Sequence, residues 1–224
     1  MEGRLTMSSS TRTASQECWL RFFNAIVYNL LAPVYGSLEW LTFGAWTRWI
    51  RRSLDYVPAE STVLEVGFGP GRLQVDMAKR CKLAFGLDLA KGMCRHTKRR
   101  LIHNGLIPRI TRGSVFELPY PSNTFDAVVS TFAFSGFPHG ADAMQEMKRV
   151  TKDGGRIILV AIGLPTDGNR IGVFLARLWE RMGDFLYDQP ELMQNAGLTV
   201  VKFEEFGPGK HLRLIVGEKS ANPS

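Results

Sequence analysis

The sequence predicts an α/β fold built on a doubly wound, mostly parallel sheet of seven strands, preceded by a helical cap. Three observations support this fold class. From Ser61 onward, short β-branched or apolar runs alternate with amphipathic segments, which is the pattern of βαβ units. The chain has 224 residues, 45% of them hydrophobic, and can bury one full core. The last two apolar runs are separated by Gly207-Pro208-Gly209, which predicts a terminal antiparallel hairpin.

The region before the sheet divides into a polar tail and an aromatic-rich cap. Residues 1–15 are rich in Ser and Thr and are expected to be a disordered tail, and residues 16–57 are expected to form the cap. Within the cap we expect helices over 18–32 and 37–54. The stretch from Phe22 to Leu38 is uncharged and nearly long enough to span a bilayer, but Pro33 interrupts it. Two shorter helices therefore fit better than one transmembrane helix.

Residues 58–219 are expected to form the main domain, with the cap attached to it and a short tail at 220–224. Its strands are expected over residues 62–66, 82–87, 109–112, 125–131, 156–162, 198–206 and 211–218. Helices are expected over residues 71–80, 90–104, 140–150, 169–183 and 190–195. In the helix over 169–183, large apolar residues recur at three- and four-residue steps: Ile171, Phe174, Leu175, Leu178 and Met182.

Charge and cysteine content limit the class of partner and the compartment. The formal net charge is +7 and the pI is near 9.5, which favours contact with lipid headgroups, a phosphorylated substrate or nucleic acid. The three cysteines are odd in number and widely spaced, so we expect no zinc or other metal site and a reduced, cytoplasmic protein. The apolar run near the amino terminus lacks a small-residue cleavage site, which argues against a signal peptide.

A glycine-rich turn directly follows the first expected strand. Thr62 to Val66 runs into Gly67-Phe68-Gly69-Pro70-Gly71, so the chain turns sharply where a helix begins. Missing side chains let a ligand approach the backbone, and the helix amino terminus supplies free N–H groups. The spacing is GxGxG, whereas dinucleotide sites usually show GxGxxG, and Glu65 suits a cationic ligand better than a pyrophosphate. The pattern thus argues against NAD.

The segment from Glu65 to Gly71 resembles motif I of the class I S-adenosylmethionine-dependent methyltransferases, and the similarity extends over Leu31 to Lys219. The resemblance implies a Rossmann-like fold, S-adenosylmethionine as cofactor and S-adenosylhomocysteine as product. In that family the glycine loop packs against the methionine part of the cofactor, and the motif I acid lies near its amino group. The corresponding positions here are Glu65, Gly67, Phe68, Gly69 and Gly71.

Asp88 closes the second strand, where a carboxylate can accept both ribose hydroxyls of a nucleoside. The alternative is that Asp88 caps the helix from Ala90 onward, and both roles can hold together. The resemblance to the methyltransferases supports ribose binding by Asp88. It also implies that Leu89 and Met93 line the adenine pocket.

Two further blocks resemble family segments that border the cofactor. After the third strand, where the family commonly places an aspartate that contacts the adenine amine, this chain has Ser114, followed by Val115 and Phe116. A hydroxyl can still form a hydrogen bond, and the N–H of Val115 is a second candidate for adenine recognition. The fourth strand ends in Ser130 and Thr131, which are expected to border the cofactor and the acceptor.

Two residues are candidates for the acceptor side. The segment from Leu31 to Tyr35 resembles the one that caps the site in the quinone and lipid methyltransferase branch, although Gly36 replaces the usual aspartate. Tyr35 is therefore a lid residue or a core residue. His139, in the loop after the fourth strand, is the candidate general base if the acceptor is a hydroxyl or an acidic carbon. The alternative is that His139 simply faces solvent.

The sequence predicts a small hydrophobic acceptor such as a lipid or quinone, because the cap is rich in Trp and Phe. After the fourth strand there is neither an Asn-Pro-Pro-Tyr element nor a Pro-Cys nucleophile, which disfavours nucleic acid. The basic residues over 90–104, with Arg48, Arg51 and Arg52, indicate either a solvated face or peripheral contact with an anionic membrane. A non-catalytic cofactor- or partner-binding module and an NAD-dependent oxidoreductase are the alternative functions, and the oligomeric state stays open.

Overall fold

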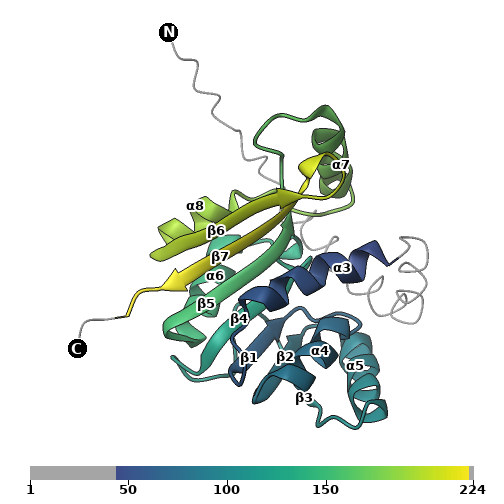
Figure 1. Ribbon diagram of the computed structural model, residues 1–224, viewed down its shortest axis with the longest axis vertical. Coiled ribbons are helices and arrows are strands. Elements are labelled where there is room, and N and C mark those ends of the chain that lie inside the picture. The colour runs from purple at the N-terminus through teal and green to yellow at the C-terminus, as the bar shows by residue number, and fades with distance from the viewer. Residues whose placement is uncertain (1–43, 222–224) are drawn as a thin grey trace.

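The structure is a computed structural model that describes residues 44–221, and all of its strands lie in one sheet (Figure 1). The order is β3-β2-β1-β4-β5-β7-β6, which confirms the predicted Rossmann-like α/β fold. The predicted tail over 1–15, the first cap helix and Tyr35 lie outside the described residues, and the domain boundaries stay predictions. The strands are β1 (Thr62–Val66), β2 (Leu83–Asp88), β3 (Arg109–Arg112), β4 (Phe125–Thr131), β5 (Thr151–Ile162), β6 (Leu198–Phe206) and β7 (Leu212–Lys219).

The helices fill the connections as the sequence predicts. They are α3 (Ala45–Arg51), α4 (Arg72–Arg80), α5 (Lys91–His103), α6 (Gly140–Val150), α7 (Arg170–Arg181) and α8 (Gln189–Asn195). Three short 3-10 helices complete the set: η1 (Arg52–Tyr56), η2 (Phe134–Gly136) and η3 (Pro208–Lys210). The second cap helix was expected to run to Leu54 as one α-helix, but the α-helical part ends at Arg51 and the chain tightens into η1.

Strand direction places the ends of β1 and β4 together. The chain starts in the middle of the sheet at β1, winds outward through β2 to β3, and returns to β4 on the other side of β1. These strands and β5 are parallel, so the carboxyl ends of β1, β2 and β4 share one edge. In this order of strands, ligands bind at the edge where the winding reverses. The topology therefore selects the carboxyl edge of β1 and β4 as the place for a site.

The terminal hairpin forms as predicted. β6 and β7 are antiparallel and are joined through η3, and β7 also pairs antiparallel with β5. The fifth strand starts earlier than expected, at Thr151, because Thr151 pairs with Phe125 before the register shifts. Gly154, at φ +73°, therefore lies inside β5.

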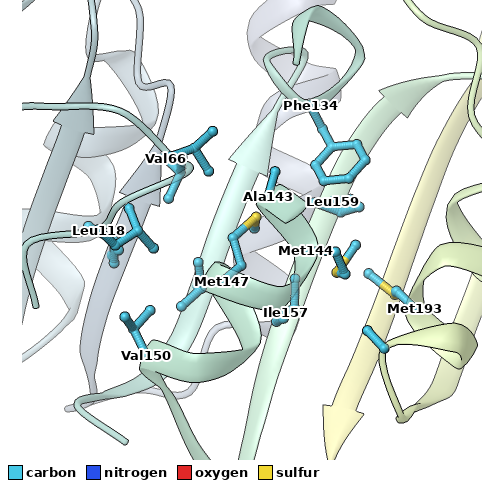
Figure 2. Close-up of a cluster of buried hydrophobic side chains, with 14 of the residues drawn as sticks. Val66, Leu118, Phe134, Ala143, Met144, Met147, Val150, Ile157, Leu159 and Met193 are labelled. Carbon is cyan, nitrogen blue, oxygen red and sulfur yellow. The ribbon is translucent and has the colours of Figure 1, made fainter. Parts of the chain in front are cut away.

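Helices cover both faces of the sheet with separate buried clusters. On one face α6 and α8 contribute Met144, Met147 and Met193, which point at the strands in Figure 2. On the other face Ile50 of α3 and Met77 of α4 pack on the sheet, together with residues of α7. The central strands are buried on both faces, and this fixes the positions of their carboxyl ends.

Candidate active site

Glu65 is a buried carboxyl group at the carboxyl end of β1. It lies next to Val129 of β4 and Gly86 of β2 in the sheet, and only 1% of its surface is exposed. Its Oε2 atom has no hydrogen-bond partner. Burial raises the pKa of Glu65 well above its ordinary value, and the nearby Asp88 carboxylate raises it further. A buried, unpaired carboxyl group costs stability, and such groups are typical of binding sites.

The three glycines after β1 all adopt positive φ, but they have different surroundings. At Gly67 and Gly71 an added Cβ would overlap the side chains of Ala133 and Thr97, so both positions are packed against protein. At Gly69, φ is +51° and an added Cβ would meet nothing within 4 Å. The backbone at Gly69 is therefore open, which is what close approach of a ligand requires.

Asp88, at the end of β2, accepts a hydrogen bond from the glycine loop. Its Oδ2 accepts a hydrogen bond from Gly69 N at 2.9 Å, and its Oδ1 accepts one from Ala90 N at 2.8 Å. Burial raises the pKa of Asp88, while these two N–H groups act in the opposite direction. The capping alternative is wrong, because Ala90 stands at the N-cap of α5 and no side chain caps that helix. The contact between Asp88 and Ala90 N is a local turn. Each carboxylate oxygen keeps a second lone pair, so ribose hydroxyls can still be accepted.

The two residues predicted for the adenine side, Met93 and Leu89, differ in burial. Met93 of α5 is buried and packs against Phe68 of the glycine loop. Leu89, directly after Asp88, is largely exposed at the carboxyl edge. Met93 thus supports the loop from beneath, and Leu89 is free to cover a ligand.

The block after β3 forms a local turn. Ser114 Oγ accepts a hydrogen bond from Phe116 N at 3.2 Å, so its hydroxyl is already used within the turn. Val115 is buried in the core on the α6 face, and Phe116 packs beside it. This geometry explains how serine substitutes for aspartate as a turn residue, because both side chains can accept a backbone N–H two positions on.

The end of β4 carries a second unpaired polar atom. Ser130 is fully buried, and its Oγ has no hydrogen-bond partner. Thr131 follows it at the strand end, half-buried, and Phe132 then adopts φ +55°, an uncommon conformation outside glycine. Because neighbouring residues alternate between faces, Ser130 lies on the α6 face with Val128, whereas Glu65 lies on the α4 face. The two unpaired groups thus flank the same edge from opposite faces of the sheet.

The unpaired atoms and the open glycine fit a ligand that carries a cation and a nucleoside. Glu65 matches a cationic group, Gly69 leaves room beside the backbone, and Asp88 can bind a diol. A third buried polar side chain, the Gln74 amide of α4, also lacks partners for both its N and its O atom. The sequence did not single out Gln74, since one polar residue in an amphipathic helix is unremarkable.

Comparison with known proteins agrees with this geometry. Residues 64–159 match the family model described as "Methyltransferase domain". The chain is 31% identical over 165 residues to the demethylmenaquinone methyltransferase of Thermus thermophilus, covering 71% of this chain and 74% of that protein. The chain belongs to the class I S-adenosylmethionine-dependent methyltransferases, in the quinone branch.

Two further similarities bear on this methyltransferase. It is 27% identical to the ubiquinone/menaquinone biosynthesis C-methyltransferase of Geobacter sulfurreducens, over 83% of this chain and 70% of that protein. A solved S-adenosylmethionine-dependent methyltransferase of Thermotoga maritima has the same fold, with a TM-score of 0.69, 18% identity, and coverage of 87% of this chain and 99% of that one. The alignments with several demethylmenaquinone methyltransferases cover 59–65% of those proteins.

In the methyltransferase, the loop after β4, which carries the predicted candidate base His139, is tied to the segment between α7 and α8. Ser135 Oγ donates a hydrogen bond to Asp184 at 2.9 Å, and Ser135 O accepts one from Phe185 N at 2.6 Å. Tyr187 OH donates to Phe137 O at 2.6 Å and accepts from Gly140 N at 3.2 Å. No sequence pattern predicts these contacts, because the partners are 47 to 50 residues apart.

Two titratable side chains belong to these joined segments: His139 on the loop after β4 and Asp184 between α7 and α8. His139 precedes α6 with an exposed side chain, and its ring packs edge-on against Phe116 with centroids 5.8 Å apart. Burial raises the pKa of Asp184, and the hydrogen bond from Ser135 partly opposes this. Asp184, on the segment between α7 and α8 that Ser135 contacts, is thus a second candidate base beside the predicted His139.

Proposed function

We propose that the methyltransferase binds S-adenosylmethionine at the carboxyl edge of β1, β2 and β4 and methylates a ring carbon of a quinone-type acceptor in its reduced, hydroxyl-bearing form. The inferred class of acceptor rests on the similarity to demethylmenaquinone methyltransferases, since the Thermus thermophilus protein is similar over 74% of its length. The unpaired Glu65 and the open Gly69 support the cofactor site independently of that relationship.

The cofactor-side residues divide the binding task. Glu65 receives the amino group of the methionine part, and Asp88 receives the ribose hydroxyls. Gly67 and Gly71 shape the loop, while Gly69 admits the ligand against the backbone. Phe68 and Met93 support the loop. Four residues are assigned to the adenine: Leu89, Ser114, Val115 and Phe116. Ser130 and Thr131, at the end of β4, border the cofactor and the acceptor.

The cofactor supplies an activated methyl group, so alignment and exclusion of water are the main tasks of the protein. Tyr35, outside the described residues, stays a proposed lid residue. Three aromatic rings in mutual contact connect the end of β4 with α7. Trp46 of α3 stacks on Phe132 with centroids 4.0 Å apart, and Trp179 of α7 lies 6.2 Å from Trp46. This aromatic group supports an apolar acceptor on that side.

Methylation of a ring carbon requires a base. Loss of a proton from a ring hydroxyl places negative charge on the neighbouring ring carbons, and this makes one of them nucleophilic. As the carbon–carbon bond forms, the bond between sulfur and the methyl group breaks and its electron pair stays on sulfur. The proton on the methylated ring carbon then moves to the ring oxygen, and the aromatic ring is restored. We assign the proton transfer to His139, with Asp184 as the alternative because burial raises the pKa of its carboxyl group above its ordinary value.

Transfer of a labelled methyl group tests the proposed function. The protein is incubated with methyl-labelled S-adenosylmethionine and a demethylated naphthoquinol, kept reduced, and the organic and aqueous phases are counted separately. We expect label in the organic phase, in a product that mass spectrometry shows to be methylated on carbon. Label in an O-methyl ether, or no transfer despite measurable cofactor binding, would contradict the proposed acceptor chemistry. The same assay with a soluble amine acceptor serves as the comparison.

A further inference from the structure

One helix beside the site exposes an apolar face. The face consists of four residues at steps of three, four and four, which we call the α7 stripe: Ile171, Phe174 and Leu178 of α7 and Met182 at its C-cap. Their exposed fractions are 64%, 64%, 41% and 54%. Residues at this spacing lie on one side of a helix. Four large apolar side chains on one side of a helix form a patch of the kind that marks an interaction site.

The other side of α7 is fixed to the fold. Ala176 is fully buried, and Gly172 lies so close to Gly209 of η3 that an added Cβ would overlap the Gly209 carbonyl oxygen. Asn169 caps the helix by accepting hydrogen bonds from Ile171 N at 3.1 Å and Gly172 N at 3.2 Å. The small residues at 172 and 176 thus determine which side of α7 faces the protein, and the stripe faces outward.

Positive charge accompanies the stripe. Arg170, Arg177 and Arg181 are exposed on α7, and the only acidic residue of the helix is Glu180. Glu180 pairs with Arg177 at 2.7 Å, whereas Arg170 and Arg181 form no ion pair within residues 44–221. An apolar face bordered by arginines is complementary to the interface of an anionic bilayer.

The stripe lies on the same side of the molecule as the site. α7 follows the carboxyl end of β5 and stands beside the turn between β6 and β7 (Figure 1). Trp179, on the same helix, connects through Trp46 to Phe132 at the end of β4. A surface that the stripe contacts would therefore adjoin the acceptor side of the site.

We propose that the α7 stripe docks on the surface of an anionic phospholipid bilayer, with α7 lying in the interface. Among the helices of residues 44–221, none has the length and apolarity to cross a bilayer. A second copy of the chain fits the stripe less well, because two α7 helices would bring arginines together. The stripe alone is a patch of roughly a few hundred Å², below the ~800 Å² per partner of a stable dimer. Docking of the α7 stripe on a bilayer does not depend on which acceptor the enzyme methylates.

Vesicle sedimentation without cofactor or acceptor tests the proposal. The full chain is mixed with vesicles of phosphatidylcholine alone, or with 30% phosphatidylglycerol added. We expect binding to the anionic vesicles and about tenfold or greater weakening for the double variant Ile171→Ser/Phe174→Ser. The matched control is Ile107→Ser/Val201→Ser, which removes side chains that are 67% and 51% exposed elsewhere, and it should bind like the unmodified chain.

Three outcomes would overturn the proposal. Equal binding of both double variants would show that the stripe does not contact lipid. Loss of binding only in Lys98→Gln/Arg99→Gln would transfer the contact to the basic face of α5, whose Lys98 and Arg99 are exposed. A lower thermal midpoint or a halved mass for Ile171→Ser/Phe174→Ser, with unchanged vesicle binding, would show that another part of the chain or a second copy covers the stripe. None of these readouts depends on methyl transfer.

Discussion

Glu65 is held in the folded protein at the expense of stability. Its pKa is raised, so the folded state keeps the Glu65 proton to a higher pH than the unfolded chain does. An unfolded glutamate ionises near pH ~4.3, so stability falls as the pH rises from there toward the folded pKa. A residue that weakens the fold in this way is more easily explained by binding than by packing.

The substitution Glu65→Gln separates these two roles. We expect the thermal midpoint at neutral pH to be unchanged or higher and the loss of stability with rising pH to be smaller, because glutamine carries no charge to bury. Affinity for S-adenosylmethionine should fall about tenfold or more, since one charge-assisted contact is lost. Thermal melts across pH and titration calorimetry provide the two measurements. Destabilisation with unaltered affinity would make Glu65 a structural residue.

Single substitutions also distinguish the two candidates for the general base, His139 and Asp184. If His139 takes the acceptor proton, His139→Ala should reduce kcat about a hundredfold at saturating cofactor. Asp184→Asn should then leave the acid limb of the pH–rate profile in place. If Asp184 is the base, activity falls with decreasing pH through its raised pKa, and Asp184→Asn removes that limb while His139→Ala does not. Near-normal rates in both variants would mean that neither residue is the base.

At the scale of elements, the glycine loop contains one position open to a ligand and two packed against protein. Only the backbone geometry makes this distinction, because the sequence shows three equivalent glycines at alternate positions. Gly71 is packed on Thr97 of α5, which also donates a hydrogen bond to Gly69 O at 2.9 Å. The loop is thus clamped between α5 and Asp88, and its open face is at Gly69.

Alanine substitutions at Gly71 and at Gly69 should therefore differ in their effects on stability and on cofactor affinity. Gly71→Ala combines a left-handed alanine, at about 1 to 2 kcal/mol, with overlap on Thr97, at roughly 1 to 3 kcal/mol, and should lower the free energy of unfolding by the sum. Gly69→Ala bears only the first cost, but its methyl group projects into the proposed cofactor space. Chemical denaturation and cofactor titration of both variants provide the check. Equal stability losses with equal affinities would contradict the assignment of Gly69.

Element boundaries were predictable where local chemistry determines them. β1, β3, β4, β6 and α6 begin and end as predicted, since β-branched runs, glycine turns and amphipathic spacing mark them in the chain. The periodicity of α7 predicted a helix, but it could not show which side is buried. A stripe of large residues usually faces the core, whereas here the narrow side of Gly172 and Ala176 does so, because it meets η3.

At the scale of the whole molecule, the predictable part of the site follows strand order. Glu65, Asp88 and Ser130 come to one edge because β1, β2 and β4 are parallel neighbours. The acceptor side was not predictable in this way. It depends on contacts such as that between Ser135 and Asp184, between segments 49 residues apart, for which the sequence has no periodic signal.

Hydrogen exchange mapped along the whole chain, with and without saturating S-adenosylhomocysteine, tests the central claim most directly. We predict slower exchange in residues 65–71, 88–93 and 114–116, at the carboxyl edge of the sheet. The segments at the opposite edge, residues 58–61, 121–124 and the start of β5 at 152–155, should be unchanged. Protection confined to the opposite edge, or no protection at a ligand concentration where calorimetry shows binding, would contradict the placement of the cofactor site.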